Sequence, residues 1–247
     1  MAYKTNLNYS PNFNPKKRNF KEIKFIIFHY TGMKSEKIAL KRLTNYKSQV
    51  SSHYLINING EITKLVPDLY IAWHAGKSKW KKYVSLNKNS IGIEITNPGH
   101  SFGYKKFPKL QILSLIKLTK FLIYKYKINK KNILGHSDIA PERKKDPGEN
   151  FPWQTLSKNK IGYWHKIDQK IQIKNRLVKI NDLQKNLFYK NVYKIGYSKK
   201  IPKNLKYKKN NYLIKIIKAF QRRFRPEIVN GKIDKECLII SQNLIKQ

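Results

Sequence analysis

The chain has 247 residues, 40% of them hydrophobic, which is enough to bury one substantial core and a small second one. Its formal net charge is +39, but the excess is mostly lysine and is scattered beside abundant Asn, Ile and Tyr, whereas a dedicated nucleic-acid binder concentrates its basic residues. The single cysteine, Cys237, excludes an intrachain disulfide, and we expect it to be a buried apolar residue of a C-terminal helix.

The first twenty residues contain no apolar stretch, no small-residue cleavage site and no cysteine, so they do not resemble a secretion signal or a lipid-anchored leader. The most apolar run, residues 110–126, is interrupted by lysines. We therefore expect no membrane span and a cytoplasmic location, with export or release by another system as the alternative. No pattern indicates the oligomeric state.

Strands and helices alternate over the first part of the chain, which predicts an α/β fold with a mixed β-sheet flanked by helices. Asn59 and Gly60 separate two alternating runs and are the strongest short signal for a hairpin. The predicted strands are residues 23–29, 53–58, 61–66, 91–96 and 132–135, and the predicted helices are residues 35–46 and 110–126.

The composition changes near residue 167, where helical patterns replace the alternation. A Lys-rich, Pro-containing stretch and the Asn230-Gly231 pair separate these helices. The pattern predicts two domains, residues 1–165 and a small all-α domain at residues 175–247. The predicted helices of the second are residues 181–193, 211–224 and 234–246.

Three residues with metal-binding side chains lie where the strands end. His29 closes the first strand, His136 follows the last one, and Asp146 lies downstream in the same loop. Each has an ordinary explanation when taken singly, as a capped or solvated residue or as part of a turn. Together, two imidazoles and a carboxylate leave a fourth tetrahedral position open, which is a ligand set of hydrolytic zinc sites.

Five segments occur in order along the chain: IIFHYTG, SSHYLINING, AWHAG, NSIGIEITNPG and GHSDIAPERKKDPGENFPW. Together they resemble the amidase-2 family of N-acetylmuramoyl-L-alanine amidases over about residues 20–155. The resemblance implies hydrolysis of the amide bond between N-acetylmuramic acid, or its anhydro form, and L-alanine in peptidoglycan or muropeptides.

The resemblance also implies roles for single residues. His29, His136 and Asp146 match the ligands of one Zn²⁺ ion per chain. Glu94 matches the general base, and Lys144 matches a lysine near the reacting carbonyl. From the residues alone, Glu94 is also compatible with an exposed edge strand, and Lys144 with a solvated lysine in a Lys-rich chain.

A second group of residues is expected to contact the substrate. Arg143 aligns with an arginine that binds a stem-peptide carboxylate. We expect Trp73, His74 and Asn97 to line the cleft, although Trp73 is equally compatible with a core position. His53 is expected to orient a neighbour, and His100 and His165 are expected at the surface.

The C-terminal segment IIKAFQRRFRPEIVNGKIDKECL resembles a three-helix peptidoglycan-binding domain, on Ala219, Phe220, Gln221, Gly231 and Asp234. A helical appendage that only packs on the first domain is the alternative. Two other functions remain as alternatives for the whole chain: a non-catalytic peptidoglycan-binding protein, and a basic nucleic-acid-binding protein. We expect a peptidoglycan or muropeptide substrate and no nucleic-acid partner.

Overall fold

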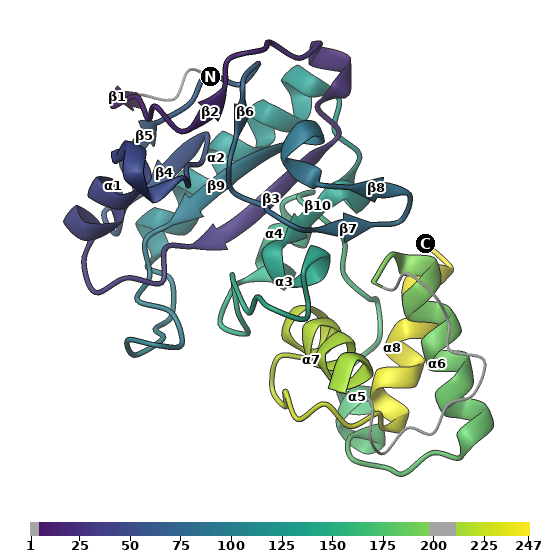
Figure 1. Ribbon diagram of the computed structural model, residues 1–247. Helices are drawn as coiled ribbons and strands as arrows, with labels where there is room; N and C mark the ends of the chain where they lie inside the picture. The colour runs from purple at the N-terminus through teal and green to yellow at the C-terminus, as the bar shows by residue number, and fades with distance from the viewer. Residues whose placement is uncertain (1–4, 198–210) are drawn as a thin grey trace.

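The computed structural model describes residues 5–197 and 211–247, and a six-stranded mixed sheet forms its centre (Figure 1). The strand order is β1-β5-β4-β9-β3-β10. The central strands β4, β9, β3 and β10 are parallel, β5 is antiparallel to β4, and β1 is parallel to β5. The bounds are β1 Thr5–Leu7, β3 Phe25–Tyr30, β4 Tyr54–Ile56, β5 Ile62–Lys64, β9 Ser90–Ile95 and β10 Ile133–Gly135.

Helices cover both faces of this sheet, as the predicted fold class requires. Four α-helices lie within or beside the sheet region: α1 Glu36–Thr44, α2 Lys109–Tyr126, α3 His136–Ile139 and α4 Trp153–Lys158. Four more follow: α5 Gln169–Asn175, α6 Asp182–Ile195, α7 Asn211–Phe224 and α8 Lys235–Ile245. Short 3₁₀ helices occur at Phe20–Glu22, Tyr46–Ser48, Leu86–Asn89 and Lys130–Asn132.

The alternation along β3 assigns its side chains to two different layers. Ile26 and Phe28 belong to a buried cluster formed with α2, to which α2 contributes Leu115, Leu118 and Leu122. Phe25 and Ile27 point to the opposite face and belong to a second cluster with the C-terminal helices. Because His29 follows in the same alternation, it lies on the face that the C-terminal helices approach.

The C-terminal helices share this second cluster with the sheet. Leu134 of β10, Phe220 of α7 and Leu238 of α8 are all members of it. Cys237 is also a member and is fully buried, which confirms its prediction as an apolar core residue. Figure 1 shows α7 lying between α3 and the remaining C-terminal helices. The division into two domains stays a prediction, since one buried cluster extends across the boundary.

Local signals account for the helix ends that the sequence located. Ser35 caps α1 through the amide of Ile38, and Asp234 caps α8 through the amide of Cys237. Gly196 follows α6 with a positive φ, and the chain turns at Gly60 between β4 and β5, where φ is +88°. The long strands and helices were therefore predicted within a few residues of their observed bounds.

Several short elements had no clear pattern and were missed. They are β1, β2 Phe13–Asn14, β6 Ile71–Ala72, β7 Lys79–Trp80, β8 Tyr83–Val84, the helices α3, α4 and α5, and the 3₁₀ helices. The expected surface position of His165 is wrong, because the side chain is 5% exposed and its Nε2 atom lies 3.2 Å from the carbonyl of Phe224. The Lys-rich stretch predicted between α6 and α7 falls mostly outside the described residues.

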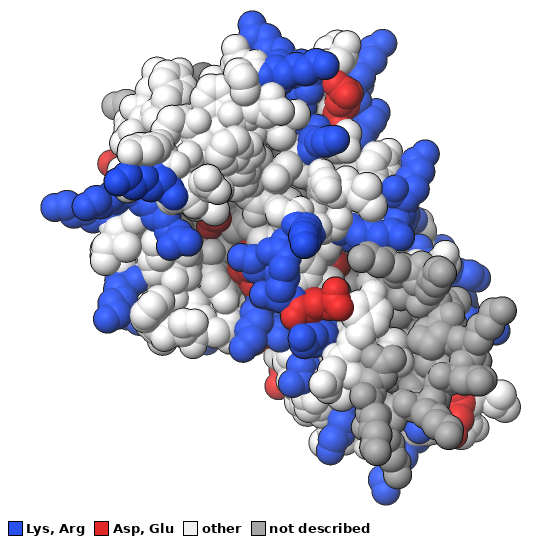
Figure 2. Space-filling view, in the orientation of Figure 1, with Lys and Arg blue, Asp and Glu red and all other residues white. Residues whose placement is uncertain are grey.

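No helix in residues 5–197 and 211–247 has both the length and the apolar character needed to cross a membrane. Lys and Arg side chains are spread over the visible face in Figure 2, over strands and helices alike. The basic residues on this face are therefore not concentrated on one helix or strand.

A buried carboxylate joins the hairpin to α2. Asp68 accepts hydrogen bonds from the hydroxyls of Tyr54 and Tyr126, each 2.6 Å away, and pairs with the ammonium groups of Lys64 and Lys125. Burial opposes ionisation, but these hydrogen bonds and charges outweigh it and lower the pKa of Asp68 to about 2.

The Asp68→Asn variant is expected to be less stable than the wild type at pH 7 by roughly 2 kcal/mol. Because the pKa of Asp68 is lower in the folded than in the unfolded chain, its contribution is complete above about pH 4 and is lost as the pH falls towards 2. Urea unfolding between pH 7 and pH 3 measures both proteins. A stability difference that widens below pH 4 would contradict this assignment.

Candidate active site

The carboxyl ends of three parallel strands bring the candidate residues together. β3 and β9 pair in a register that places His29 directly opposite Glu94. β10 pairs with β3 so that Gly135 lies opposite Phe28, and His136 follows immediately. Asp146 lies in the loop after α3, where its carbonyl accepts a hydrogen bond from the amide of Ser137. Ligand sites commonly form at the carboxyl ends of parallel strands.

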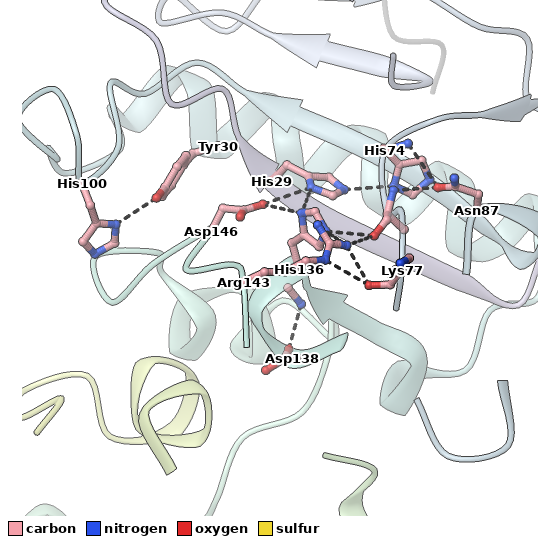
Figure 3. Close-up of polar contacts among 12 residues, drawn as sticks. His29, Tyr30, His74, Lys77, Asn87, His100, His136, Asp138, Arg143 and Asp146 are labelled. Atoms are coloured by element: carbon pink, nitrogen blue, oxygen red, sulfur yellow. Dashed lines mark hydrogen bonds and ion pairs between the residues drawn. The ribbon is translucent and has the colours of Figure 1, made fainter. Parts of the chain in front are cut away.

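His29, His136 and Asp146 form a tight triangle (Figure 3). The Nδ1 atoms of the two histidines are 2.9 Å apart. Oδ2 of Asp146 lies 3.1 Å from Nδ1 of His29 and 3.0 Å from Nδ1 of His136. All three side chains are buried. Ligand atoms around a tetrahedral zinc ion lie roughly 3.3 Å apart, so this donor set fits the metal that the sequence predicts.

The other ring nitrogens of the two histidines are held by separate partners. Nε2 of His29 lies 3.0 Å from Nδ1 of His74, whose Nε2 lies 3.2 Å from the hydroxyl of Ser90. Nε2 of His136 lies 3.1 Å from the carbonyl of Ala75. With protons on these Nε2 atoms, both Nδ1 lone pairs are directed at the centre of the triangle, which is the arrangement that metal-binding histidines use.

The electrostatics of the triangle favour a neutral His29 beside an ionised Asp146. Burial, followed by the neighbouring His136, lowers the pKa of His29 to about 4. Burial, followed by His29, lowers the pKa of His74 well below its usual value. Although burial opposes ionisation of Asp146, the neighbouring His136 and His29 hold its pKa below the usual range. These are the protonation states in which such side chains bind a metal.

Glu94 lies beside the triangle on the same face of the sheet. Its Oε2 atom is buried and has no hydrogen-bond partner among the described residues. Burial, and then the charge of Asp146, raise the pKa of Glu94 well above its ordinary value, whereas Lys144 lowers it. A carboxylate with a raised pKa and an unpaired oxygen is suited to accept and return a proton.

A cleft of about 970 Å³ opens over these residues and contains His29, Glu94, His136, Lys144 and Asp146 in its lining. The cleft therefore brings together the predicted metal ligands and both predicted catalytic residues. Further basic residues line it, namely Lys41, Arg42, Lys47, Arg143 and Lys145.

The four predicted substrate contacts are placed differently from one another. Trp73 lines the cleft with 36% of its surface exposed. His74 also reaches the lining, but it is 9% exposed and supports His29 from behind. Arg143 donates from Nε and Nη2 to the carbonyl of Lys77, and from Nη2 to that of Ala75, so it holds the 75–77 segment at the cleft wall.

Asn97 does not line the cleft, contrary to expectation. It is 2% exposed, its Nδ2 donates to the carbonyl of Lys105, and its Oδ1 accepts from the amide of Gly99. The side chain therefore shapes the 97–105 loop.

Sequence reasoning missed a polar network at one end of the cleft. His100, expected at the surface, is half-buried between Tyr30 and Glu149, with Nδ1 2.9 Å from the Tyr30 hydroxyl and Nε2 3.1 Å from the carboxylate. It also stacks on Tyr104. Asn87 was missed as well, although its Oδ1 accepts from the amides of His74 and Ala75. His100, Tyr104 and Asn87 lie outside the five segments that carry the family resemblance, and the segments that contain Tyr30 and Glu149 gave no indication of this network.

Comparison with known proteins agrees with this geometry. The family model for N-acetylmuramoyl-L-alanine amidase matches residues 19–149. N-acetylmuramoyl-L-alanine amidase AmiD of Escherichia coli K12 is 35% identical over 240 residues, an alignment that covers 92% of this chain and 84% of that protein. The 1,6-anhydro-N-acetylmuramyl-L-alanine amidase AmpD of Haemophilus influenzae is 33% identical over 163 residues, covering 59% of this chain and 86% of that protein.

Solved structures with the same fold hold muropeptides. The complex of AmiD from E. coli with anhydro-N-acetylmuramic acid-L-Ala-D-gamma-Glu-L-Lys has a TM-score of 0.77 at 34% identity, and the match covers 91% of this chain and 89% of that one. AmpDh3 from Pseudomonas aeruginosa, in complex with anhydromuramic pentapeptide, has a TM-score of 0.76 at 30% identity, covering 93% and 92%.

The His74→Phe variant is expected to bind zinc about 10- to 100-fold more weakly than the wild type. Phenylalanine keeps a ring at this position but removes the nitrogen that fixes the orientation and proton position of His29. Competition with a chromophoric chelator measures the affinity. Trp73→Phe is the matched control and should bind zinc as the wild type does. Unchanged affinity in His74→Phe would show that His29 needs no such support.

Proposed function

The chain belongs to the N-acetylmuramoyl-L-alanine amidase family, and we propose that it cleaves the amide bond between N-acetylmuramic acid, or its anhydro form, and L-alanine with the help of one zinc ion. The observation that carries this proposal is the convergence of His29, His136 and Asp146, whose ligand atoms lie within 4.8 Å of one another in a cleft that also contains Glu94.

The metal would be held by Nδ1 of His29, Nδ1 of His136 and one oxygen of Asp146. A zinc ion bound there supplies a water whose pKa is lowered to about 7 and polarises the substrate carbonyl. The three ligands are buried in the protein but also line the cleft. The water and the substrate carbonyl would therefore approach from the cleft side.

Glu94 is proposed as the general base. It lies opposite His29 in the neighbouring strand, and it lines the same cleft as His29, His136 and Asp146. It would accept a proton from the attacking water and return it to the leaving nitrogen. The unpaired Oε2 atom supports this role, because no structural hydrogen bond competes for it in the described part of the chain.

Lys144 is proposed to stabilise the negative charge that develops on the carbonyl oxygen. It lines the same cleft as Glu94 and His29. Its charge opposes the rise in the pKa of Glu94, which supports a position near the reacting groups. A fixed cation in a partly dry cleft is an effective stabiliser of such charge.

The substrate is proposed to be a muropeptide or peptidoglycan strand with free stem-peptide carboxylates. The basic residues that line the cleft complement those carboxylates. Trp73 is proposed to contact the sugar or peptide with its exposed ring face. Nε and Nη2 of Arg143 already donate to the carbonyls of Ala75 and Lys77. Its proposed contact with a substrate carboxylate would therefore use the remaining N–H donors of the guanidinium group.

Peptidoglycan binding by the C-terminal helices is a separate proposal, which rests on the resemblance of residues 216–238 to a peptidoglycan-binding domain. Phe220 and Gln221, which carry the resemblance, are fully buried, and Gln221 bonds the backbone of Gly231 and Lys232. These residues therefore explain how the helices fold. Residues 1–165 and 175–247 are the proposed domains. A cytoplasmic location is proposed, with action on the wall after export or release as the alternative.

The wild-type protein is expected to contain one zinc ion per chain and to release free stem peptide from muropeptides. Asp146→Ala should lose both zinc and activity, because two neutral imidazoles alone are a poor zinc site. Elemental analysis and mass spectrometry of digests measure the two properties. Parallel digests of intact sacculi and small anhydro-muropeptides report the preferred substrate, and cleavage at any other bond would refute the proposed reaction.

The Glu94→Gln variant is expected to keep its zinc and to turn over about 10²- to 10⁴-fold more slowly, because it loses only the proton-transfer group. Initial rates on a muropeptide, normalised to bound zinc, measure the effect. Glu61→Gln makes the same chemical change at the exposed hairpin and should behave as the wild type. Wild-type turnover in Glu94→Gln would remove the carboxylate from the mechanism.

A further inference from the structure

The turn that carries His136 is anchored by a buried carboxylate. Asp138 is 1% exposed, and its Oδ2 accepts a hydrogen bond of 2.8 Å from the amide of Gly135, the residue before His136. Ser137 lies between His136 and Asp138, and its amide donates a hydrogen bond to the carbonyl of Asp146. The short helix α3 therefore connects two of the three proposed zinc ligands to Asp138.

Two residues from the C-terminal part of the chain hold Asp138 in place. Arg223 of α7 forms a buried ion pair with Oδ2 through Nη1, and its Nη2 donates to the carbonyl of Ile133 in β10 at 2.9 Å. The hydroxyl of Tyr197, just after α6, donates to Oδ1 at 2.5 Å. Arg223 thus bonds both the strand before His136 and the turn after it.

The environment of Arg223 leaves this side chain little freedom. It is 2% exposed, and its guanidinium carbon lies 4.2 Å from the ring centre of Trp153 and 5.0 Å from that of Phe224. In such a dry, packed site an ion pair is strong and directional, and removing one partner leaves the other charge uncompensated.

We propose that Arg223 and Tyr197 are positioning residues for the metal site, which act through Asp138 to hold His136 and Asp146 in metal-binding geometry. The C-terminal helices are in this respect a part of the active-site framework, whether or not they also bind glycan. The inference rests on the proposed zinc site, since its effect is on the position of that site's ligands.

The test compares the zinc affinities of full-length variants by competition with a chromophoric chelator. Arg223→Met removes the charge but keeps most of the side-chain volume, and we expect about tenfold weaker zinc binding. Arg223→Lys should recover part of the loss, because an ammonium group can still pair with Asp138. Tyr197→Phe removes one hydroxyl only, folds with its ring in place, and is expected to weaken zinc binding about threefold.

Leu238→Ala is the matched control, because it loosens the same buried cluster without touching Asp138. It should lower the unfolding midpoint of the zinc-free protein and leave zinc affinity within about twofold of the wild type. Equal affinity losses in Leu238→Ala and Arg223→Met would reduce Arg223 to a general stabilising role and overturn the inference. So would wild-type affinity in both Arg223→Met and Tyr197→Phe. Absence of zinc from the wild type would instead refute the proposed function.

Discussion

The parallel pairing of β3 with β9 and β10 is the constraint on which the rest of the site depends. It places His29 opposite Glu94 and brings His136 to the end of the adjacent strand. Three polar groups thereby meet at one edge of an otherwise apolar sheet, where burial makes each of them costly unless it is paired or bound. The register sets the positions of His29, Glu94 and His136, and Asp146 completes the triangle from the loop after α3.

Much of this arrangement could be predicted because it is local in the sequence. The apolar runs of β3 and β9, the Asn59-Gly60 turn and the caps of α1 and α8 each depend on neighbouring residues. The proposed ligands His29, His136 and Asp146 were also recognisable, since each lies in a motif at a strand end. Their convergence in one cleft supports that recognition.

Contacts between distant segments could not be predicted in the same way. His74 was expected to contact substrate. Its contact with His29 could not be predicted, because the two residues are far apart in the sequence. His165 and Arg223 are polar residues in a Lys-rich chain, and only the folded structure reveals that they are buried at the junction with the C-terminal helices. At the same junction, residues from both sides of position 167 belong to one buried cluster, a contact that the composition change does not indicate.

Position 92 illustrates a requirement that differs from those of the ligands. A Cβ atom on Gly92 would lie 2.4 Å from the ring of His74, so the imidazole occupies the space that a side chain at position 92 would fill. The support of His29 thus depends on a side chain that is absent. Any side chain at position 92 would displace the imidazole that holds Nε2 of His29, so the glycine serves the proposed metal site without offering a chemical group of its own.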